Sequence, residues 1–553
     1  MLDQNTLQVI PLGGLGEIGK NMTAARQGSG MILVDCGMAF PDEEMPGIDL
    51  VLPDFTFLRE HAAELRGIVL THGHEDHVGA IPYVLREFNV PVYGSRLTLG
   101  LVRSKLREFG IKNADLREVK DGERIDRGGF NIEFIHVNHS IPGAAAIALR
   151  ANAGLIVFSG DYKVDYTPID GPPTDLGRFA ELGNEGVLAY FGDSTNSERP
   201  GYVPSERTVG ETLNKVFDKA KGRIIVASFA SHLHRVQQVV EAAKRHDRLV
   251  GLSGRSMVRN VGIARELGYL DLPESMIVDQ RDVNKVPDKD IVVLTTGSQG
   301  EPLAALSRIA AGTHRSIEVG DNDTVVIAAH PIPGNERGVA RTIDNLMKQG
   351  AEVVYSPLVP VHVSGHAAQE EQKLILSLLK PRYLVPVHGE FRMLKHHAET
   401  AMSMGISSEN IFILENGAVV EFRGDSARRL DNVASGMFLV DGGGLADTSD
   451  SIMRERQQLS ADGMFVVIAR IDARTGALLG EPDVISRGFM DPQTANGLMD
   501  GSVETVTKTL QRTAKRNVTD WGQLKNEIRR DLSSFLSQKT RKRPIILPLI
   551  VEV

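Results

Sequence analysis

A short stretch rich in histidine and acid restricts the fold of this chain more than any other feature. Residues 72–77 read HGHEDH and directly follow the apolar run GIVLT, which is typical of a buried strand. Alternate residues of an extended segment point to the same side, so His72 and His74 can bind one cation together. Asp76 and His77, at the next turn, can face a second cation, and such ligands suit zinc. A solvated polar loop is the alternative interpretation, but so dense a cluster at a strand end favours a metal site.

Three further candidates for metal ligation close predicted strands elsewhere in the chain. His139 ends FNIEFIHVNH, Asp161 ends LIVFSGD, and His388 ends the strand in RYLVPVHGE. A rigid sheet can direct strand-end side chains into one cleft, although each residue could instead be a core or capping residue. Asp35 follows the run MILV and could orient a ligand histidine from behind, or could simply be a turn residue.

The order of apolar runs predicts an α/β chain with three kinds of region. Up to about residue 205, short strands alternate with glycine-rich turns, and Asn152–Gly154 predicts a hairpin. From there, strands and helices alternate, which predicts a mostly parallel, doubly wound sheet. Further on, NIFILENGAVVEF predicts a hairpin at Asn416–Gly417. The last region, with strand MFVVIARI, two helices and strand RPIILPLIVEV, predicts a small α/β domain.

Composition excludes several classes of protein. With 553 residues, 42% of them apolar, the chain is too hydrophobic for a disordered protein and long enough for several domains. Its single cysteine, Cys36, excludes an intrachain disulfide and favours a reducing, cytoplasmic location. No signal peptide or membrane span is expected, because the apolar runs are short. The net charge of −9 argues against a general polyanion binder but is compatible with a local basic channel.

These motifs resemble a known family. The pattern at 72–77 matches the hallmark of metallo-β-lactamase-fold nucleases, and Asp35, His139 and Asp161 match the other metal-site motifs in order. Three additional motifs of the β-CASP group occur as Asp193 in FGDSTN, His366 in HVSGH and His388 in PVHGE. The blocks LGGLGEIGKN, GSQGEP, HPIPGNE and KRPIILP extend the match over essentially the whole chain. The chain is thus identified as a member of the bacterial ribonuclease J family of β-CASP nucleases.

The resemblance implies an architecture. An αββα metallo-β-lactamase sandwich would comprise residues 1–205 and 365–430, with a doubly wound β-CASP domain inserted at 206–364. A linker at 431–462, rich in Gly, Asp and Ser, would lead to a small α/β C-terminal domain at 463–553. The cleft between the first two domains would form a channel for single-stranded RNA.

The resemblance also implies a ligand set for two zinc ions per subunit, with Mn²⁺ or Mg²⁺ as alternatives. His72, His74 and His139 would hold one ion, Asp76, His77 and His388 the other, and Asp161 would bridge them. Asp76 would also steer the attacking water in phosphodiester hydrolysis. His366 would be the general acid, oriented by Asp193, unless it merely caps the following helix. Backbone N–H groups of Ser364, Gly365 and His366 could contact the scissile phosphate.

The implied activity is RNA degradation in the 5′-to-3′ direction from 5′-monophosphate ends, with possible endonuclease cleavage, in RNA decay and maturation including rRNA. Two loops that follow strands of the inserted domain could hold the terminal phosphate, and Arg255 could add charge. Ordinary strand-to-helix turns are the alternative for these loops. The expected phosphate-binding residues are Ser228, Ser231, Gly297, Ser298 and Gln299.

Several alternatives stay open at this stage. The pattern at Gly14, Gly16 and Gly19 is formally a dinucleotide fingerprint, but the following stretch is too short for the crossover helix that it requires. The basic run at 539–543 could contact RNA, contact a partner or be solvated. A small-molecule hydrolase with the same metal core, and a non-catalytic RNA-binding subunit, are the competing functions. Expected partners are RNA, a second copy in a homodimer or homotetramer, and members of an RNA-decay complex, with no membrane.

Overall fold

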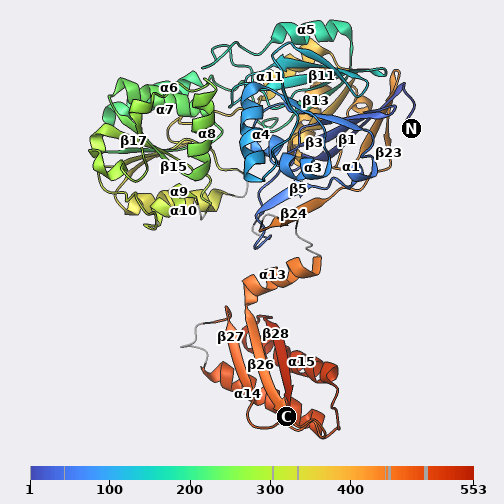
Figure 1. Cartoon of the computed structure of the whole chain (residues 1–553), viewed down its shortest axis with the longest axis vertical. Coiled ribbons are helices and arrows are strands. Elements are labelled where there is room, and N and C mark those ends of the chain that lie inside the picture. The colour runs from blue at the N-terminus through green and yellow to red at the C-terminus, as the bar shows by residue number, and fades with distance from the viewer. Residues whose placement is uncertain are drawn as a thin grey trace. The chain divides into compact units, whose positions relative to one another are not determined.

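The computed structural model describes residues 2–42, 44–301, 304–332, 335–442, 444–445, 450–490 and 496–553, with only the backbone considered at 450 and 496 (Figure 1). It divides into two compact units: residues 1–40 with 51–438, and residues 41–50 with 439–553. Among the described residues, no helix is long and apolar enough to cross a membrane.

Two sheets packed face to face form the centre of the first unit. The larger sheet has the order β23-β22-β1-β3-β4-β6-β7-β8 and the smaller β20-β13-β12-β11-β10-β9. The larger sheet comprises β1 (Thr6–Gly13), β3 (Met22–Gln27), β4 (Gly30–Val34), β6 (Leu65–Val69), β7 (Val92–Gly94), β8 (Leu116–Glu118), β22 (Val419–Arg423) and β23 (Ser426–Leu430). The smaller comprises β9 (Arg124–Arg127), β10 (Phe130–His136), β11 (Ala145–Ala151), β12 (Gly154–Phe158), β13 (Val187–Asp193) and β20 (Tyr383–Val387).

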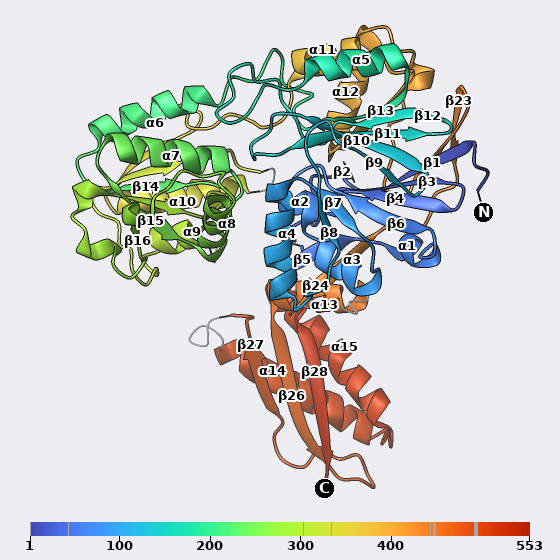
Figure 2. The same ribbon diagram turned by 45° about the horizontal axis from the view of Figure 1, so that its top comes forward.

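Alternation along the strands explains why both faces of the smaller sheet are buried. In β10 and β11, Phe134 and Ile147 belong to the core between the sheets, whereas Ile135 and Ala146 belong to a second core under the outer helices. Helices cover the outer faces, so the layers are αββα as expected (Figure 2). These helices are α1 (Thr56–Glu60), α2 (Glu75–Val78), α3 (Ile81–Glu87), α4 (Arg96–Glu108), α5 (Leu176–Glu185), α11 (Gln369–Leu379) and α12 (Phe391–Ser403).

One of the two predicted hairpins is confirmed and the other is wrong. β11 and β12 pair in antiparallel fashion with Ala151 opposite Gly154. The chain around Asn416–Gly417 is no hairpin, because Phe412 donates its N–H to Leu384 of β20 and the Asn416 side chain accepts from the Leu15 N–H. The hairpin forms one strand later, between β22 and β23.

The start of the chain is a meander rather than a dinucleotide-binding unit. β1 pairs antiparallel with β3, and β3 antiparallel with β4, without a crossover helix. The glycine-rich loop between β1 and β3 holds the two-residue strand β2 (Leu15–Gly16), which pairs with β21 (Gly389–Glu390) directly after His388. The loop therefore supports a candidate ligand instead of a nucleotide.

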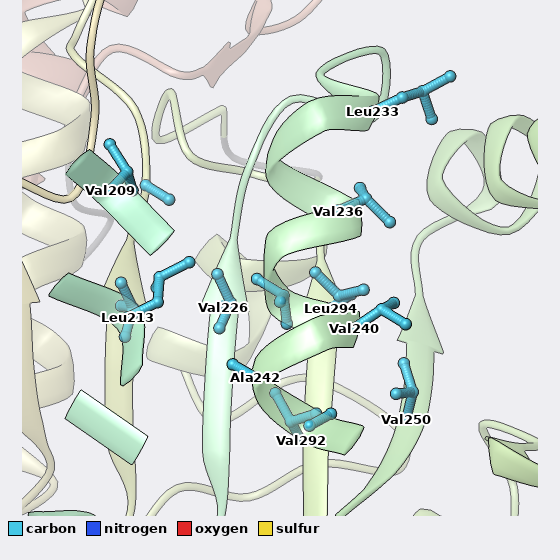
Figure 3. Close-up of a cluster of buried hydrophobic side chains, with 14 of the residues drawn as sticks. Val209, Leu213, Val226, Leu233, Val236, Val240, Ala242, Val250, Val292 and Leu294 are labelled. Atoms are coloured by element: carbon cyan, nitrogen blue, oxygen red, sulfur yellow. The ribbon is translucent and has the colours of Figure 1, made fainter. Parts of the chain in front are cut away.

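The inserted region is a doubly wound domain, as expected. Its six strands are all parallel, in the order β16-β15-β17-β14-β18-β19. In Figure 3, Val226 of β14 and Leu294 of β17 pack against Val236 and Val240 of α7, while Ile225 faces a separate core on the other side. The elements are α6 (Arg207–Lys219), β14 (Ile224–Ala227), α7 (Leu233–Arg245), β15 (Leu249–Ser253), α8 (Arg255–Glu266), β16 (Ile277–Val278), β17 (Ile291–Thr295), α9 (Ala305–Ala310), β18 (Thr324–Ile327), α10 (Glu336–Lys348) and β19 (Glu352–Tyr355).

The second unit contains a three-stranded sheet of order β27-β26-β28, with β28 parallel and β27 antiparallel to β26. One face, with Phe465 and Val467, packs on Leu510, Ile528 and other helix residues. The elements are α13 (Asp450–Asp462), β26 (Met464–Ile471), β27 (Asp483–Arg487), α14 (Asn496–Ala514), α15 (Trp521–Thr540) and β28 (Ile545–Glu552). The interval 431–462, expected as a linker, contains regular structure: α13 and also β24 (Met437–Asp441), which with β25 (Gly444–Leu445) and β5 (Leu50–Pro53) forms a further sheet.

Candidate metal centre

The motif at 72–77 begins three residues after the end of β6 and bends into a short helix. His72 lies on the extended segment, and α2 begins directly after His74, so Asp76 and His77 lie in its first turn. This change from extended to helical backbone turns the two pairs of side chains toward neighbouring positions.

The first pair meets two residues from other strand ends. His72 Nε2 and His139 Nε2 lie 3.0 and 3.1 Å from His74 Nδ1. Asp161 Oδ2 lies 3.5 Å from His72 Nε2 and 3.7 Å from His139 Nε2. A tetrahedral zinc ion with ligands at about 2.0–2.1 Å separates its ligand atoms by roughly 3.3 Å. These four donors therefore have the spacing that a cation would require.

The second pair forms a similar group around the same aspartate. His77 Nε2 lies 3.6 Å from Asp76 Oδ2 and 3.3 Å from Asp161 Oδ1. His388 Nε2 lies 3.2 Å from Asp76 Oδ2 and 3.7 Å from Asp161 Oδ2. Asp161 Oδ1 is buried and has no hydrogen-bond partner among the described residues. The donor types, their spacing and this unpartnered oxygen indicate divalent-metal binding.

Outer contacts fix the orientation of these histidine rings. His77 Nδ1 lies 2.8 Å from Asp35 Oδ2, so Asp35 lies behind a candidate ligand. His139 Nδ1 lies 2.8 Å from the Gly365 carbonyl, and His388 Nδ1 lies 2.6 Å from Thr195 Oγ1. In each case one ring nitrogen is engaged outside the cluster and the other faces the cation position. The Asn21 amide also lies 3.1 Å from His77 Nε2, so a cation would replace this contact.

Sequence reasoning missed these supporting groups. Thr195 lies two residues after Asp193 in FGDSTN, so its position in that motif was the available signal. The Gly365 carbonyl comes from HVSGH, where no side chain signals its role. His388 adopts a left-handed conformation (φ 54°) and donates its N–H to the Gly14 carbonyl at 3.0 Å. The structure thus explains why LGGLGEIGKN accompanies the histidine motifs.

A hydrogen-bonded pair lies beside the cluster. His366 Nδ1 lies 2.8 Å from Asp193 Oδ2 and 3.9 Å from Asp161 Oδ2. Asp193 is buried at the end of β13, whereas the His366 side chain keeps 20% of its surface exposed. The Asp193 contact engages Nδ1, which leaves Nε2 as the nitrogen that can exchange a proton with a substrate.

The pKa shifts of the histidines depend on burial and on how close the carboxylates lie. Burial lowers the pKa of His74 to about 4 and holds the pKa values of His72 and His139 well below their usual range. Burial acts in the same direction on His77 and His388, but Asp161 and other nearby carboxylates outweigh it, so the pKa of His77 is raised well above its usual range and that of His388 to about 9. Neutral imidazole is the form that binds metal, so a cation would displace a proton from these two rings. For His366, burial acts in the same direction, but the Asp193 and Asp161 carboxylates outweigh it, so its pKa is raised. A protonated His366 is the form that a general acid requires.

The loops expected to hold a 5′-phosphate follow β14 and β17, which are neighbours in the parallel sheet. Ser228 is buried, its N–H donates to Thr295, and its hydroxyl has no partner among the described residues. Gly297 has a φ of 99°, which a side chain would not readily adopt. Gln299 is engaged within the domain: its amide donates to the His330 carbonyl and accepts from the Ile332 N–H. Ser298 is buried, Ser231 is half-buried, and the Ser364 hydroxyl accepts from the His366 N–H.

Unpartnered polar atoms also lie near these loops. Among the described residues, Nε2 of His232, Nε2 of His234 and Nδ1 of His362 are buried without a hydrogen-bond partner. The His232 and His362 rings are 6.1 Å apart. Lys163 Nζ has no hydrogen bond and lies 3.5 Å from Asp165. Buried donors of this kind are suited to an anion, and the sequence did not single them out.

Family models match nearly all parts of this architecture. The metallo-beta-lactamase superfamily matches residues 15–199, and the ribonuclease J beta-CASP domain matches 221–346. The Zn-dependent metallo-hydrolase RNA specificity domain matches 351–414, and the ribonuclease J C-terminal domain matches 451–553. Fold and site together define a metallo-β-lactamase-fold hydrolase with a β-CASP insertion.

Similar proteins define the family of this chain within that class of hydrolases. Ribonuclease J2 of Bacillus subtilis is 40% identical, with 100% of both chains covered. Ribonuclease J of Mycolicibacterium smegmatis is 42% identical, over 99% of this chain and 97% of the relative, and that of Thermus thermophilus is 40% identical, over 99% and 96%. The chain therefore belongs to the ribonuclease J family and is a hydrolase that acts on RNA. A solved structure of a protein of unknown function from Enterococcus faecalis V583, with a TM-score of 0.53 and 16% identity over 75% of this chain and 100% of that one, shares the fold alone.

Proposed function

We propose that this ribonuclease uses two zinc ions. His72, His74 and His139 would hold one, Asp76, His77 and His388 the other, and Asp161 would bridge them. The observation that carries the proposal is the pair of donor groups that share Asp161 and lie beside the His366–Asp193 pair. Mn²⁺ or Mg²⁺ could replace zinc only with a change of coordination, because histidine-rich sites suit zinc.

The bound metals would supply a nucleophile at neutral pH and stabilise charge on the phosphoryl oxygens. The residues of the chain do the rest of the chemistry. The Asp76 carboxylate borders the cluster and can orient the attacking water. His366 donates a proton from Nε2 to the leaving 3′-oxygen, while Asp193 holds its Nδ1–H and stabilises the charged ring. The backbone N–H groups of Ser364 and Gly365 can contact the phosphate, whereas that of His366 donates to the Ser364 hydroxyl.

We further propose 5′-to-3′ exonuclease action from 5′-monophosphate ends. The support is the pair of loops after β14 and β17, with Ser228, Ser231, Gly297 and Ser298, beside the unpartnered nitrogens described above. Gln299 would act indirectly, by holding the 330–332 segment. Endonuclease cleavage, roles in RNA decay and maturation including rRNA, and association with RNA-decay partners belong to the same proposal. So does action in the cytoplasm, which suits a chain whose one cysteine is free and buried.

The direct test measures metal and products together. Purified protein is assayed for zinc content, then for cleavage of a 5′-labelled RNA before and after chelation, with zinc, manganese or magnesium added back. We expect about two zinc ions per chain, release of labelled mononucleotide, and loss of activity that zinc restores. Full activity of the metal-free protein would contradict the two-zinc proposal. Internal fragments alone would contradict the exonuclease proposal.

We also propose that the second unit mediates self-association, giving a homodimer or a homotetramer. The sheet face turned away from α14 and α15 carries apolar side chains in register: Ile485, Val466 and Leu547 form one row, and Ile468 and Leu549 the next. Ile485, Leu547, Leu549 and Val551 are each exposed by more than 40%. Such a face is costly to leave in water.

Charge at the rim of this face supports a second copy of the chain as its occupant. Asp483 and Arg487 lie on the open face at opposite ends of β27, and both are exposed. A two-fold axis that lies between the two faces and runs perpendicular to the strands would place Arg487 of each copy against Asp483 of the other. The face is therefore self-complementary, as an isologous dimer interface requires.

A further inference from the structure

Glu371 is a buried carboxylate that gathers three separate segments of the chain. It lies in the first turn of α11 with none of its surface exposed. Its Oε1 accepts a hydrogen bond from the Val164 N–H at 2.8 Å. Its Oε2 accepts from the N–H groups of Val203 at 2.9 Å and Ala368 at 2.8 Å. All three donors are backbone amides, so the carboxylate acts as a junction.

Each of these three segments adjoins, in sequence, a residue or strand of the candidate metal centre. Val164 lies three residues after Asp161, on the segment that leaves β12. Val203 belongs to the connection from β13 into the β-CASP domain. Ala368 lies two residues after His366, on the segment that returns from that domain. Glu371 therefore joins the outgoing and returning connections to the strand end that supplies the shared aspartate.

Other hydrogen bonds already join two of these three segments without Glu371. The Asn196 amide donates to the His366 carbonyl at 2.8 Å, and the Gln369 N–H donates to the Arg199 carbonyl at 3.0 Å. The Gln372 amide donates to the Asp193 carbonyl at 3.2 Å. These bonds hold the start of α11 against the 193–203 connection. Glu371 adds the bond to Val164 and so fixes both connections to the Asp161 segment.

We propose that Glu371 is a positioning residue for the cleavage step, which holds His366 in place between Asp193 and Asp161. This inference rests on the proposed role of His366 as general acid. His366 lies on a loop rather than within a helix or strand, so its place at 2.8 Å from Asp193 and 3.9 Å from Asp161 depends on the segments that flank it. Proton transfer is sensitive to such placement, since a shift of about 1 Å in a reacting group can cost roughly 10²-fold in rate.

The substitution Glu371→Gln should disturb these hydrogen bonds without changing the shape of the side chain. A carboxylate offers only acceptors, whereas an amide replaces one acceptor with an N–H₂ donor. Whichever way the amide turns, at least one backbone N–H faces another donor. The shape of the side chain is kept and one to two hydrogen bonds are lost.

The experiment measures single-turnover cleavage, RNA affinity and metal content of the full chain. For Glu371→Gln we expect cleavage of bound RNA to slow by about 10- to 100-fold, with RNA affinity and zinc content within about twofold of wild type. Glu133→Gln is the matched control, because Glu133 is an equally buried carboxylate in the same sandwich, on β10, and binds Arg150 and Arg178. It should lower the melting temperature and leave the cleavage rate near wild type.

A double-mutant cycle with His366→Ala separates positioning from general stability. If Glu371 acts through His366, Glu371→Gln slows the His366→Ala enzyme by less than about twofold. Losses that multiply would overturn the positioning role while leaving the general acid intact. Unchanged turnover in His366→Ala alone would refute the proposed acid, and the positioning role with it. Should Glu371→Gln fail to fold, Glu371→Asp, which keeps both acceptors but is one methylene shorter, is put through the same cycle with the same readings.

Discussion

At the scale of single residues, this centre depends on how each histidine divides its two ring nitrogens. His77, His139 and His388 each engage one nitrogen with Asp35, Gly365 or Thr195 and leave the other for the cluster. A ring whose inner nitrogen carried the proton and donated it in a hydrogen bond could not bind a cation through that nitrogen. The outer contacts thus decide which protonation and orientation the cluster presents.

We expect His77→Ala to abolish hydrolysis while the protein stays folded. The substitution removes a donor to the second group and the partner of Asp35, so the cation held with Asp76 and His388 would be lost. Zinc content should fall by about one ion per chain, with circular dichroism unchanged. Near wild-type cleavage of RNA by this variant would exclude the two-metal assignment.

His366→Ala should lower turnover far more than RNA affinity. Loss of a general acid typically costs on the order of 10²–10⁴ in rate, and His366 lies at the edge of the donor groups. Single-turnover rates and equilibrium RNA binding distinguish the two effects. Weaker binding with an unchanged rate of cleavage in the complex would make His366 a phosphate contact only.

His397 provides a stability test at low pH. It is fully buried beside Ser194, with its Nδ1 3.0 Å from the hydroxyl, and burial lowers its pKa to about 4. The unfolded chain, with an ordinary pKa of about 6.5, binds more protons between these values. The stabilisation is therefore complete above pH 6.5 and is lost as the pH falls toward 4, by about 1.4 kcal/mol per unit.

His397→Gln removes this titration. The difference in free energy of unfolding between wild type and variant should shrink by about 2 kcal/mol from pH 7.5 to pH 5.0, as measured by denaturant unfolding. His396→Gln, at the neighbouring position, whose side chain is 45% exposed, is the control. A difference that stays constant across this range would show that His397 is not held neutral by burial.

At the scale of elements, the sequence pattern predicted where strands lie better than it predicted which strands pair with each other. Continuous apolar runs identified β4 and β14, and the alternation of strands with helices predicted the parallel sheet. The hairpin at Asn416–Gly417 was predicted wrongly, because Asn416 binds the Leu15 N–H across the fold and no local pattern records a partner that far away. Strand β27 was also missed, since DVISR is short and half polar.

The candidate site was easier to predict from sequence than its supporting contacts. Metal donors belong to a few residue types and gather in short motifs at strand ends, so their positions were visible. Which groups share an ion came from family resemblance. The Thr195 and Gly365 contacts could not be predicted, since hydroxyls and carbonyls occur throughout the chain and only the tertiary fold selects these two.

The loops after β14 and β17 carry a prediction at this scale. A pocket suited to a monophosphate should exclude a triphosphate, so exonucleolytic cleavage should be faster on 5′-monophosphate RNA. Ser228→Ala removes a buried hydroxyl without an internal partner, and should reduce the preference without changing internal cleavage. Ser205→Ala, at an exposed hydroxyl that bonds Thr167, is the matched control. Equal rates on both RNA ends with the wild-type enzyme would count against the pocket.

At the scale of the whole molecule, the two units differ in the kinds of surface and side chain that they present. The first unit contains both candidate donor groups complete, so no donor from the second unit is needed. The second unit buries one sheet face under helices and leaves the other apolar. A function in association therefore suits it better than a function in chemistry.

A single substitution on the open sheet face of the second unit should therefore change the oligomeric state. Leu547→Glu places a charge in the row with Val466 and Ile485, and should convert the proposed homodimer to a monomer by light scattering, with zinc content unchanged. Ser534→Glu, on the exposed side of α15, is the control and should remain dimeric. Cleavage of short RNA should persist in both.

Charge reversal then tests whether the partner is a second copy of the same face. Arg487→Glu alone should weaken the dimer, since two acidic ends would meet across the two-fold axis. Adding Asp483→Arg to the same chain restores opposite charges at each end, and the dimer should recover. A hetero-partner or a different face would give no such recovery, because its own charges would be unchanged. Full-length assembly that persists in Leu547→Glu would rule out this face as the interface.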